Sequence, residues 1–316
     1  MIDNFEIPQE MQEYVNIQDF IYNSDIVSLE SLCFTDDLNM SREIVVFVKT
    51  RPMKIGLALD LCAGLIKKSE IFKDFLIMQS MIRCPIIFYK LFEMGYISFP
   101  CIEPYILEYK SLLPSLYFFS HISDIKIIKN FRDVENVYRK YPEIWNNNPT
   151  LLNELINFGF PLNSIEYIIK YDDCGNLKNR IDMELKDYKI EWSPFEWSYQ
   201  CRSSCLLGFA AHFGSLRCFR LLMLNGFVVN DFVIMESIFG GSFDIVHLLP
   251  QNYTIKHLEI ASQSCQAQIY NWIVENSQIE NEMVFGLLFK PIILFIIDKK
   301  INELSIKYLF FYIIRQ

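Results

Sequence analysis

Glycine and proline are scarce in this sequence. Its 316 residues include 11 glycines and 12 prolines, against 27 phenylalanines and 17 tyrosines. A β-rich chain of this length would need many tight turns, which glycine and proline favour. Because 52% of the residues are hydrophobic, the chain can nevertheless bury a large core. The composition disfavours a hairpin-rich β architecture and favours packed helices.

Lysine and arginine are absent from residues 1–41, which carry nine carboxylates. Removing these nine from the 38 acidic residues leaves 29, which balance the 29 basic residues of the chain. A neutral body without a basic stripe cannot neutralise many phosphates, so we expect no nucleic acid as a direct partner. The acidic segment is interpreted as a solvated helix face, and docking to a basic partner stays open as the alternative.

Paired cysteine motifs, a secretory signal and long apolar runs are also missing. The nine cysteines form no C-x-x-C pair, and the first residues, MIDNFEIPQEM, have neither a basic nor an apolar signal region. We therefore expect reduced thiols and a cytoplasmic location. Residues 283–298 and 306–316 are the most apolar, but both are shorter than the roughly 20 residues that cross a bilayer. We expect an apolar tail or cap there and no membrane span.

Helical spacing dominates the apolar pattern of residues 52–95. Pro52 suits the first turn of a helix whose apolar residues recur at i, i+4, i+7 and i+11. These residues are Ile55, Leu59, Cys62 and Ile66. A second helix is predicted from Ser69, and its expected buried side consists of Ile71, Phe75, Met78 and Ile82. A third begins at Pro85 and stops at Gly95, so residues 69–95 are predicted to form a helical hairpin.

Another helical hairpin is predicted for residues 205–230. Apolar residues crowd the run before Gly214, and after Ser215 they recur with helical spacing at Leu216, Phe219, Leu222 and Met223. Gly226 is expected to end this helix, because the C-terminal cap favours φ above zero. A unit of about 26 residues cannot bury its own apolar face, so stacked neighbours are expected.

Repeated sequence supports such neighbours. ELINFGFPLN at 154–163 aligns with LLMLNGFVVN at 221–230, and GSLRCFRLL at 214 recurs as GSFDIVHLL at 241. A weaker third copy follows at 261–272, and the NNNP run at 146–149 predicts a boundary. The predicted organisation is an acidic N-terminal segment (1–41), a helical N-terminal domain (42–150), repeats (151–276, clearest at 203–250) and an apolar C-terminal tail or cap (277–316).

The stretch LLGFAAHFGSLRCFRLLMLNGFVVN resembles the ankyrin repeat, whose consensus is roughly TPLHLAAxxGHLEIVKLLLxxGADVN. The matching columns are Ala210, Ala211, Gly214, Leu216, Phe219, Leu221, Leu222, Gly226, Val229 and Asn230. With IKYDD at 169–173 and KIEWSPFEWSYQ at 189–200, residues 45–276 are similar to the expanded ankyrin-repeat proteins of parasitic protists. That resemblance implies an all-α fold, in which a helical-hairpin solenoid of degenerate ankyrin repeats follows a helical N-terminal domain of unknown function. It also implies a non-catalytic protein-protein interaction module, a scaffold or adaptor.

Two departures from the ankyrin pattern shift the expected binding surface. The TPLH start is CLLG at 205–208, and residues are missing between Asn230 and Phe232, where the β-hairpin finger belongs. We therefore expect a partner protein on the concave face of the inner helices. The candidate positions from the matching columns are Phe209, His212, Phe213, Glu236, Phe239, Glu259, Ser262 and Gln263. Plain surface or end packing is the alternative for this set, and backbone bracing is the alternative for His212.

Motifs that carry catalysis or bind cofactors are not found. The sequence contains no G-x-S-x-G, H-E-x-x-H, G-x-G-x-x-G or P-loop string, so no cofactor is expected. No metal is expected either, because no familiar zinc spacing matches the candidate ligands Cys201, Cys205, His212 and Cys218. An aromatic cluster could stack a sugar or base, but we interpret it as a cap or connector of the solenoid. Its members are Trp192, Phe195, Trp197 and Tyr199.

Two other interpretations of function stay open. One is an enzyme with an unrecognised site in residues 45–150, which would show a pocket with convergent titratable groups of shifted pKa. The other is a truncated chain without a selected function, because the repeat columns vanish after about residue 276 and the composition turns apolar.

Overall fold

A computed structural model describes most of the central part of the chain. The described residues are 37–50, 52–109, 117–118, 139–145, 149–181, 185, 188–190, 193–196, 205–264 and 266–277. Within these ranges the regular elements are helices and no strand occurs, which confirms the predicted all-α class. Most of the acidic segment and nearly all of the apolar tail lie outside the described residues, so the predictions for them stay predictions.

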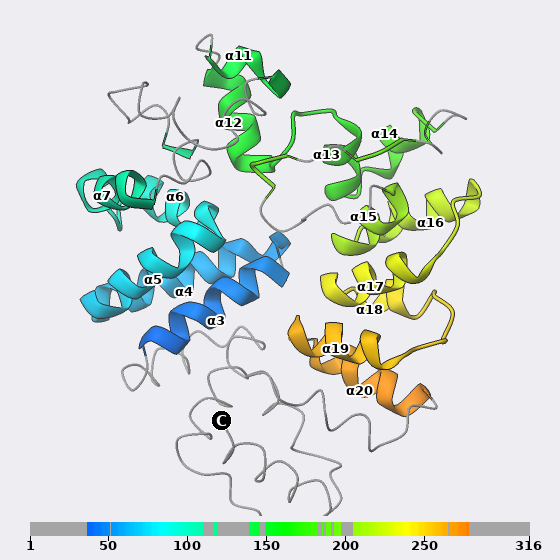
Figure 1. Cartoon of the computed structure of the whole chain (residues 1–316). Coiled ribbons are helices and arrows are strands. Elements are labelled where there is room, and N and C mark those ends of the chain that lie inside the picture. Colours follow the sequence, from blue (N-terminus) through cyan, green and yellow to red (C-terminus); the bar gives the residue numbers. More distant parts are fainter. Residues whose placement is uncertain are drawn as a thin grey trace, which may run out of the picture.

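The first helical group occupies one side of Figure 1. Its elements are α3 (Asp37–Thr50), η1 (Pro52–Lys54), α4 (Ile55–Lys68), α5 (Glu70–Arg83), α6 (Pro85–Glu93) and α7 (Phe99–Tyr109). Helix α5 packs against α3, α4 and α6. The predicted stripe of α4 is confirmed, because Leu59, Cys62 and Ile66 are buried and Ile55 packs against the same cluster.

The predicted hairpin at 69–95 is confirmed, but its first helix is rotated relative to the prediction. Ser69 accepts a hydrogen bond from the Phe72 amide, and Gly95 has a φ of 78° after α6. Ile71, which was predicted to be buried, is 63% exposed, and the buried residues are instead Phe72, Leu76 and Ile77. The i, i+4 pair Phe72 and Leu76 faces the other helices, so the predicted stripe lies about one position away from the true buried face. The side chains of Met78 and Ile82 lie outside the described residues.

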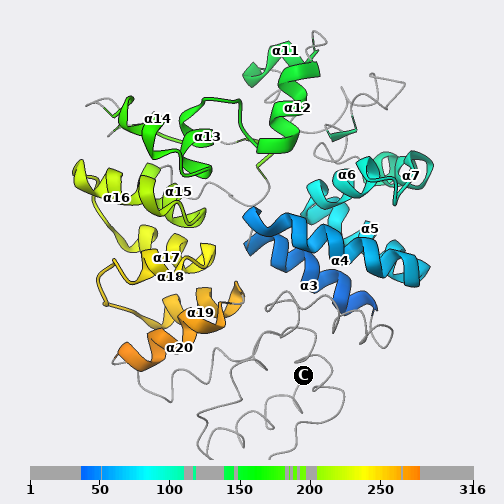
Figure 2. The same cartoon turned by 180° about the vertical axis from the view of Figure 1, so that it is seen from behind.

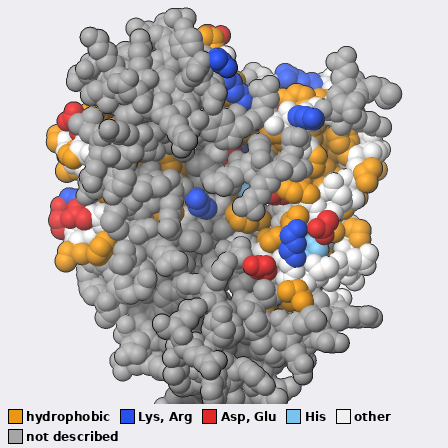
Figure 3. Space-filling view, in the orientation of Figure 1, with side chains coloured by type: hydrophobic (Ala, Val, Ile, Leu, Met, Phe, Trp, Pro, Cys, Tyr) orange, Lys and Arg blue, Asp and Glu red, His pale blue; other side chains and the backbone are white. Residues whose placement is uncertain are grey.

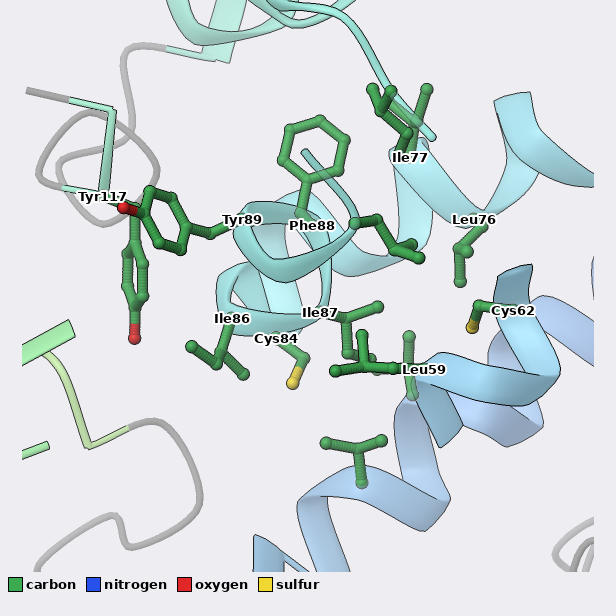
Figure 4. Packing of buried hydrophobic residues seen from close by; sticks show 14 of the residues in the cluster. Leu59, Cys62, Leu76, Ile77, Cys84, Ile86, Ile87, Phe88, Tyr89 and Tyr117 are labelled. Carbon is green, nitrogen blue, oxygen red and sulfur yellow. The ribbon is translucent and has the colours of Figure 1, made fainter. Parts of the chain in front are cut away.

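Side chains from α4 and α5 converge on those of α6 in the first hydrophobic cluster (Figure 4). The ring of Phe118 lies between 5.3 and 6.1 Å from four other rings, those of Phe88, Tyr89, Phe92 and Phe99. Two further helices, α11 (Pro142–Trp145) and α12 (Pro149–Phe158), contribute Ile144, Leu155 and Ile156 to the same cluster. The boundary expected at residue 150 therefore falls inside α12, and the second cluster begins only at Phe160.

Four helix pairs form the second group and stack in order along the chain (Figures 1 and 2). The pairs are α13 (Ile165–Lys170) with α14 (Cys174–Lys178), α15 (Leu206–His212) with α16 (Leu216–Leu224), α17 (Asp231–Gly240) with α18 (Phe243–Val246), and α19 (Ile255–Gln263) with α20 (Ala267–Asn276). We call α13, α15, α17 and α19 the inner helices, since both views show them on the side of the first group, and the others the outer helices. Each inner helix contacts the next inner helix, and each outer helix contacts the next outer helix.

The same helix caps and turns recur in successive pairs. Three inner helices begin with a side chain that accepts the amide N–H three residues on, namely those of Ser164, Cys205 and Asn230. Between the inner and outer helix the chain adopts positive φ, at Asp172 (54°), Gly214 (67°) and Gly241 (71°). The helix after Gly214 ends as predicted, because Gly226 follows α16 with a φ of 82°.

Each of these turns packs against the start of the next outer helix. The Asp172 carboxylate accepts the amide N–H groups of Arg217 and Cys218 at 3.2 and 2.8 Å, and so caps α16. A Cβ atom at Gly214 would lie 3.5 Å from Cβ of Ser242, next to α18. A Cβ atom at Gly241 would overlap the side chain of Gln266, next to α20. At three successive levels, the turn of one pair therefore lies against the start of the next outer helix, although the contacting groups differ.

Candidate protein-binding surface

The predicted partner-binding positions lie on or beside α15, α17 and α19, but not all of them reach the surface. A partner-binding position on the concave face must be exposed, and this expectation is wrong for Phe209, His212 and Phe213, because all three are buried. The chain itself covers α15: the Phe160 ring lies 5.7 Å from that of Phe209, and the Lys170 ammonium lies 5.2 Å from the centroid of Phe213. These three residues therefore belong to the core of the stack.

The positions on the next two inner helices are more accessible. Glu236, Phe239 and Glu259 are half-buried. Ser262 and Gln263 lie on α19, and their side chains are outside the described residues. The candidate positions that are not buried in the core thus lie on α17 and α19. We call these five positions the inner surface.

His212, at the end of α15, links this helix to α17. Its Nδ1 atom lies 2.8 Å from Oε2 of Glu236, and its ring stacks on Phe239 with centroids 5.4 Å apart and an angle of 16°. His212 of α15 therefore contacts both candidate residues of α17. Backbone bracing was the alternative expected for His212, but its Nδ1 atom contacts the Glu236 carboxylate.

A buried ion pair that the sequence did not reveal lies where the two hydrophobic clusters meet. Nζ of Lys170 lies 2.6 Å from Oε2 of Glu196, and the two side chains are 8% and 2% exposed. The same ammonium donates to the carbonyl oxygen of Phe158 at 2.9 Å. Burial of two charges is tolerated only when both are paired and hydrogen-bonded, as they are here. The one hint in the sequence is an acidic residue inside the aromatic run of residues 192–199.

Residues 193–196 connect the two clusters. Phe195 is buried in the first cluster, where its carbonyl oxygen accepts the Tyr117 hydroxyl at 3.0 Å. Ser193 donates to the carbonyl oxygen of Gly159 at 2.5 Å, and Glu196 reaches α13 through Lys170. Phe195 therefore has the connecting role that was predicted for this aromatic cluster, while its other three members lie outside the described residues.

His257, which the sequence analysis also did not single out, fixes the start of α19. Its Nδ1 atom accepts the amide N–H of Thr254 at 2.9 Å and lies 3.1 Å from the Thr254 hydroxyl. A backbone amide can only donate, so Nδ1 is unprotonated and the ring proton is on Nε2, 3.1 Å from Oδ1 of Asp231. Burial lowers the pKa of His257, and the nearby Asp231 carboxylate opposes that shift.

The titratable groups with the largest pKa changes in the first helical group are core residues. Burial raises the pKa of the Cys62 and Cys84 thiols and of the Tyr117 hydroxyl far above their ordinary values. A high pKa disfavours the thiolate that a cysteine nucleophile needs. These groups therefore give no support to a reaction centre in residues 45–150.

Metal-binding and membrane-spanning features were sought in the described part of the chain. There, no three His, Cys, Asp or Glu side chains come close enough together to hold a metal ion. The six described cysteines are free thiols. Among the same residues, no helix has both the length and the apolar character to cross a bilayer.

Comparison of the chain with protein-family models, with curated proteins and with solved structures gives no match. The interpretation of this chain therefore rests on its own residues and geometry.

Proposed function

We propose that this chain is a non-catalytic protein-interaction module, in which a solenoid of degenerate ankyrin repeats follows a helical N-terminal domain. The observation that carries this proposal is the repetition of one contact pattern through four helix pairs, with positive φ at Asp172, Gly214 and Gly241. Repeats of this kind contact only their neighbours and present a long surface to partners.

The start of α19 adds support for the ankyrin interpretation. Thr254 and His257 stand in the sequence TIKH, which has the T-x-x-H spacing of the TPLH consensus that is replaced by CLLG at 205–208. The imidazole ties the threonine amide and hydroxyl to the first turn of the helix. This bracing supports an ankyrin-like assignment for the pair α19 and α20, whose sequence match is the weakest.

The partner is proposed to bind the inner surface formed by Glu236, Phe239, Glu259, Ser262 and Gln263. The inner surface includes one aromatic residue and two acidic residues, which suits a partner with apolar and basic side chains, since charge complementarity sets orientation and association rate. No direct contact with nucleic acid is proposed, and free thiols suit a reducing compartment such as the cytoplasm.

A quantitative pull-down from cell extract tests this proposal. The full chain is compared with a variant that carries Glu259→Arg and Gln263→Ala, and with the matched control Glu103→Arg, whose site is exposed on α7. We expect a reproducibly enriched protein to be lost from the first variant and kept by the control. Retention of that protein by both variants, or loss from both, would contradict binding at the inner surface.

A further inference from the structure

The inner surface combines apolar and acidic groups. Phe239 on α17 is half-buried, and so is Met235, which stands four residues earlier and shares its side of the helix. The carboxylates of Glu236 and Glu259 belong to the same surface. In Figure 3, acidic and hydrophobic side chains lie close together over the flank that carries the helix pairs. An occupant of this surface therefore needs apolar side chains together with basic ones.

Helices α17 and α19 together are acidic. Their charged residues are Asp231, Glu236, Glu259 and Lys256, a formal charge of −2 with neutral histidine. Nζ of Lys256 lies 4.0 Å from Oδ2 of Asp231, so these two charges offset each other. The excess negative charge is thus that of the two carboxylates of the inner surface. The outer helices α16 and α18 have the opposite sign, since they carry two arginines and one aspartate.

Residues 283–316, which we call the C-terminal segment, have the complementary composition. Of these 34 residues 22 are hydrophobic, and five basic residues stand against two acidic ones, a formal charge of +3. The basic residues are Lys290, Lys299, Lys300, Lys307 and Arg315. A segment with so many apolar side chains gains free energy when another surface covers it, and its positive charge favours an acidic surface.

The C-terminal segment begins within reach of the inner surface. Helix α20 ends at Asn276 and contacts α19. Residues 277–282, which join α20 to the segment, have a maximal span of about 20 Å. The axes of packed helices lie about 8–10 Å apart, and Glu259 is the central residue of α19, about 7 Å from either end. The segment can therefore reach Glu259 without any movement of the helices.

We propose that the C-terminal segment docks on the inner surface and that a partner protein must displace it. This inference rests on the proposed function, since it adds a regulator to the same surface. Because the segment is tethered next to α19, its effective concentration there is on the order of millimolar. The apparent dissociation constant of the partner then rises as the fraction of chains with an open surface falls.

Photo-crosslinking of the purified full chain tests the docking. Benzoylphenylalanine replaces Gln263 on α19, which keeps both carboxylates of the inner surface, or Glu103 on α7 as the control. We expect the probe at position 263, but not the control, to crosslink to peptides of the C-terminal segment at a yield that does not depend on protein concentration. A yield that rises with concentration would mean that a second copy supplies the segment. That result, or no crosslink to residues 283–316, would overturn the proposal.

Charge reversal tests the complementarity. Lys299→Glu together with Lys300→Glu is expected to lower the crosslinking yield by at least about threefold. The control, Lys67→Glu together with Lys68→Glu, makes the same change at two exposed residues of α4 and should leave the yield unchanged. Circular dichroism checks that the helical content of each variant matches that of the wild type. The proposal is overturned if the first variant keeps the wild-type yield, or if both variants lose it to the same extent.

A pull-down from cell extract separates this inference from the proposed function. If both are correct, the variant with Lys299→Glu and Lys300→Glu should enrich the partner protein at least about threefold more than the wild type does. Equal enrichment would overturn the regulatory role of the segment. If no protein is enriched by any variant, the proposed function fails, whereas the crosslink in the purified chain still decides whether the segment docks.

Discussion

The two hydrophobic clusters of this chain are built in different ways. The first gathers large side chains around α6 and the Phe118 ring, without a repeated contact. The second brings helices together at small residues: a Cβ atom at Gly240 would overlap the backbone of His212, and one at Gly208 would press on the Phe232 ring. Large side chains therefore fill the first cluster, whereas repeated caps and close backbone contacts bring the helices of the second together.

Substitution in the ion pair that connects the two clusters should lower the free energy of unfolding more than any other change considered below. Glu196→Ala leaves the Lys170 ammonium buried without its carboxylate, and we expect the free energy of unfolding to fall by about 3–5 kcal/mol. Urea unfolding followed by circular dichroism measures this loss. The control Glu70→Ala, which removes an exposed partner of Lys73, should cost less than about 1 kcal/mol.

A second variant separates a lost ion pair from a general packing defect. When Lys170→Met accompanies Glu196→Ala, no unpaired charge stays buried, and a substantial part of the stability should return. If the double variant is as unstable as Glu196→Ala alone, charge pairing is not what joins the clusters.

In the first cluster, the effect of truncation should follow side-chain volume. Leu76→Ala on α5 leaves a cavity among buried residues, so the free energy of unfolding should fall by about 2–5 kcal/mol. Ile71→Ala on the same helix should change it by less than about 0.5 kcal/mol, because that side chain is exposed. If urea unfolding shows equal losses of stability for Leu76→Ala and Ile71→Ala, then Ile71 is buried as the sequence predicted and α5 is rotated relative to the structure.

In the second cluster, adding one methyl group should be enough to disturb the packing. Gly240→Ala places Cβ against the backbone of His212, which cannot rotate away, so a loss of about 1–3 kcal/mol is expected. The matched change Gly56→Ala in α4 meets no atom within 4 Å and should stabilise the protein by about 0.5–1 kcal/mol. Thermal unfolding of both variants decides the comparison, and the same sign for both would contradict it.

The smallest predicted effect is the pH dependence that His257 contributes. Burial lowers its folded-state pKa below the ordinary value of 6.5, so the unfolded chain binds the extra proton more readily. The stability due to neutral His257 is therefore complete above pH 6.5 and is lost as the pH falls through the lowered folded-state pKa. Urea midpoints measured from pH 7.5 to 5.5 should decline less steeply for His257→Gln than for the wild type. An unchanged slope would show that this histidine does not titrate on unfolding.

The sequence predicted helices better than it predicted their surroundings. Gly95 and Gly226 act through local backbone preferences, and their positions after helix ends are confirmed. Pro52 begins the 3-10 helix η1, and α4 itself begins three residues later, at Ile55. The face of α5 was missed because α5 is apolar on adjacent stripes, and only the positions of α3, α4 and α6 select between them.

The binding surface was predicted only in part, for a physical reason. Phe209 and Phe213 stand in the matching columns, but Phe160 and Lys170, 49 and 43 residues earlier in the chain, cover them. Periodicity does not report such distant contacts. The buried pair of Lys170 and Glu196 was missed for the same reason, whereas Thr254 and His257 form a local motif that the sequence does display.

Site-specific photo-crosslinking in cell extract would test the central claim most directly. A benzoylphenylalanine residue is placed at position 259 on the inner surface, or at position 103 on α7 as the control. The account predicts that position 259 captures the same protein that the full chain enriches, and that position 103 does not. Capture of that protein at position 103, with none at position 259, would contradict a partner-binding surface on the inner helices.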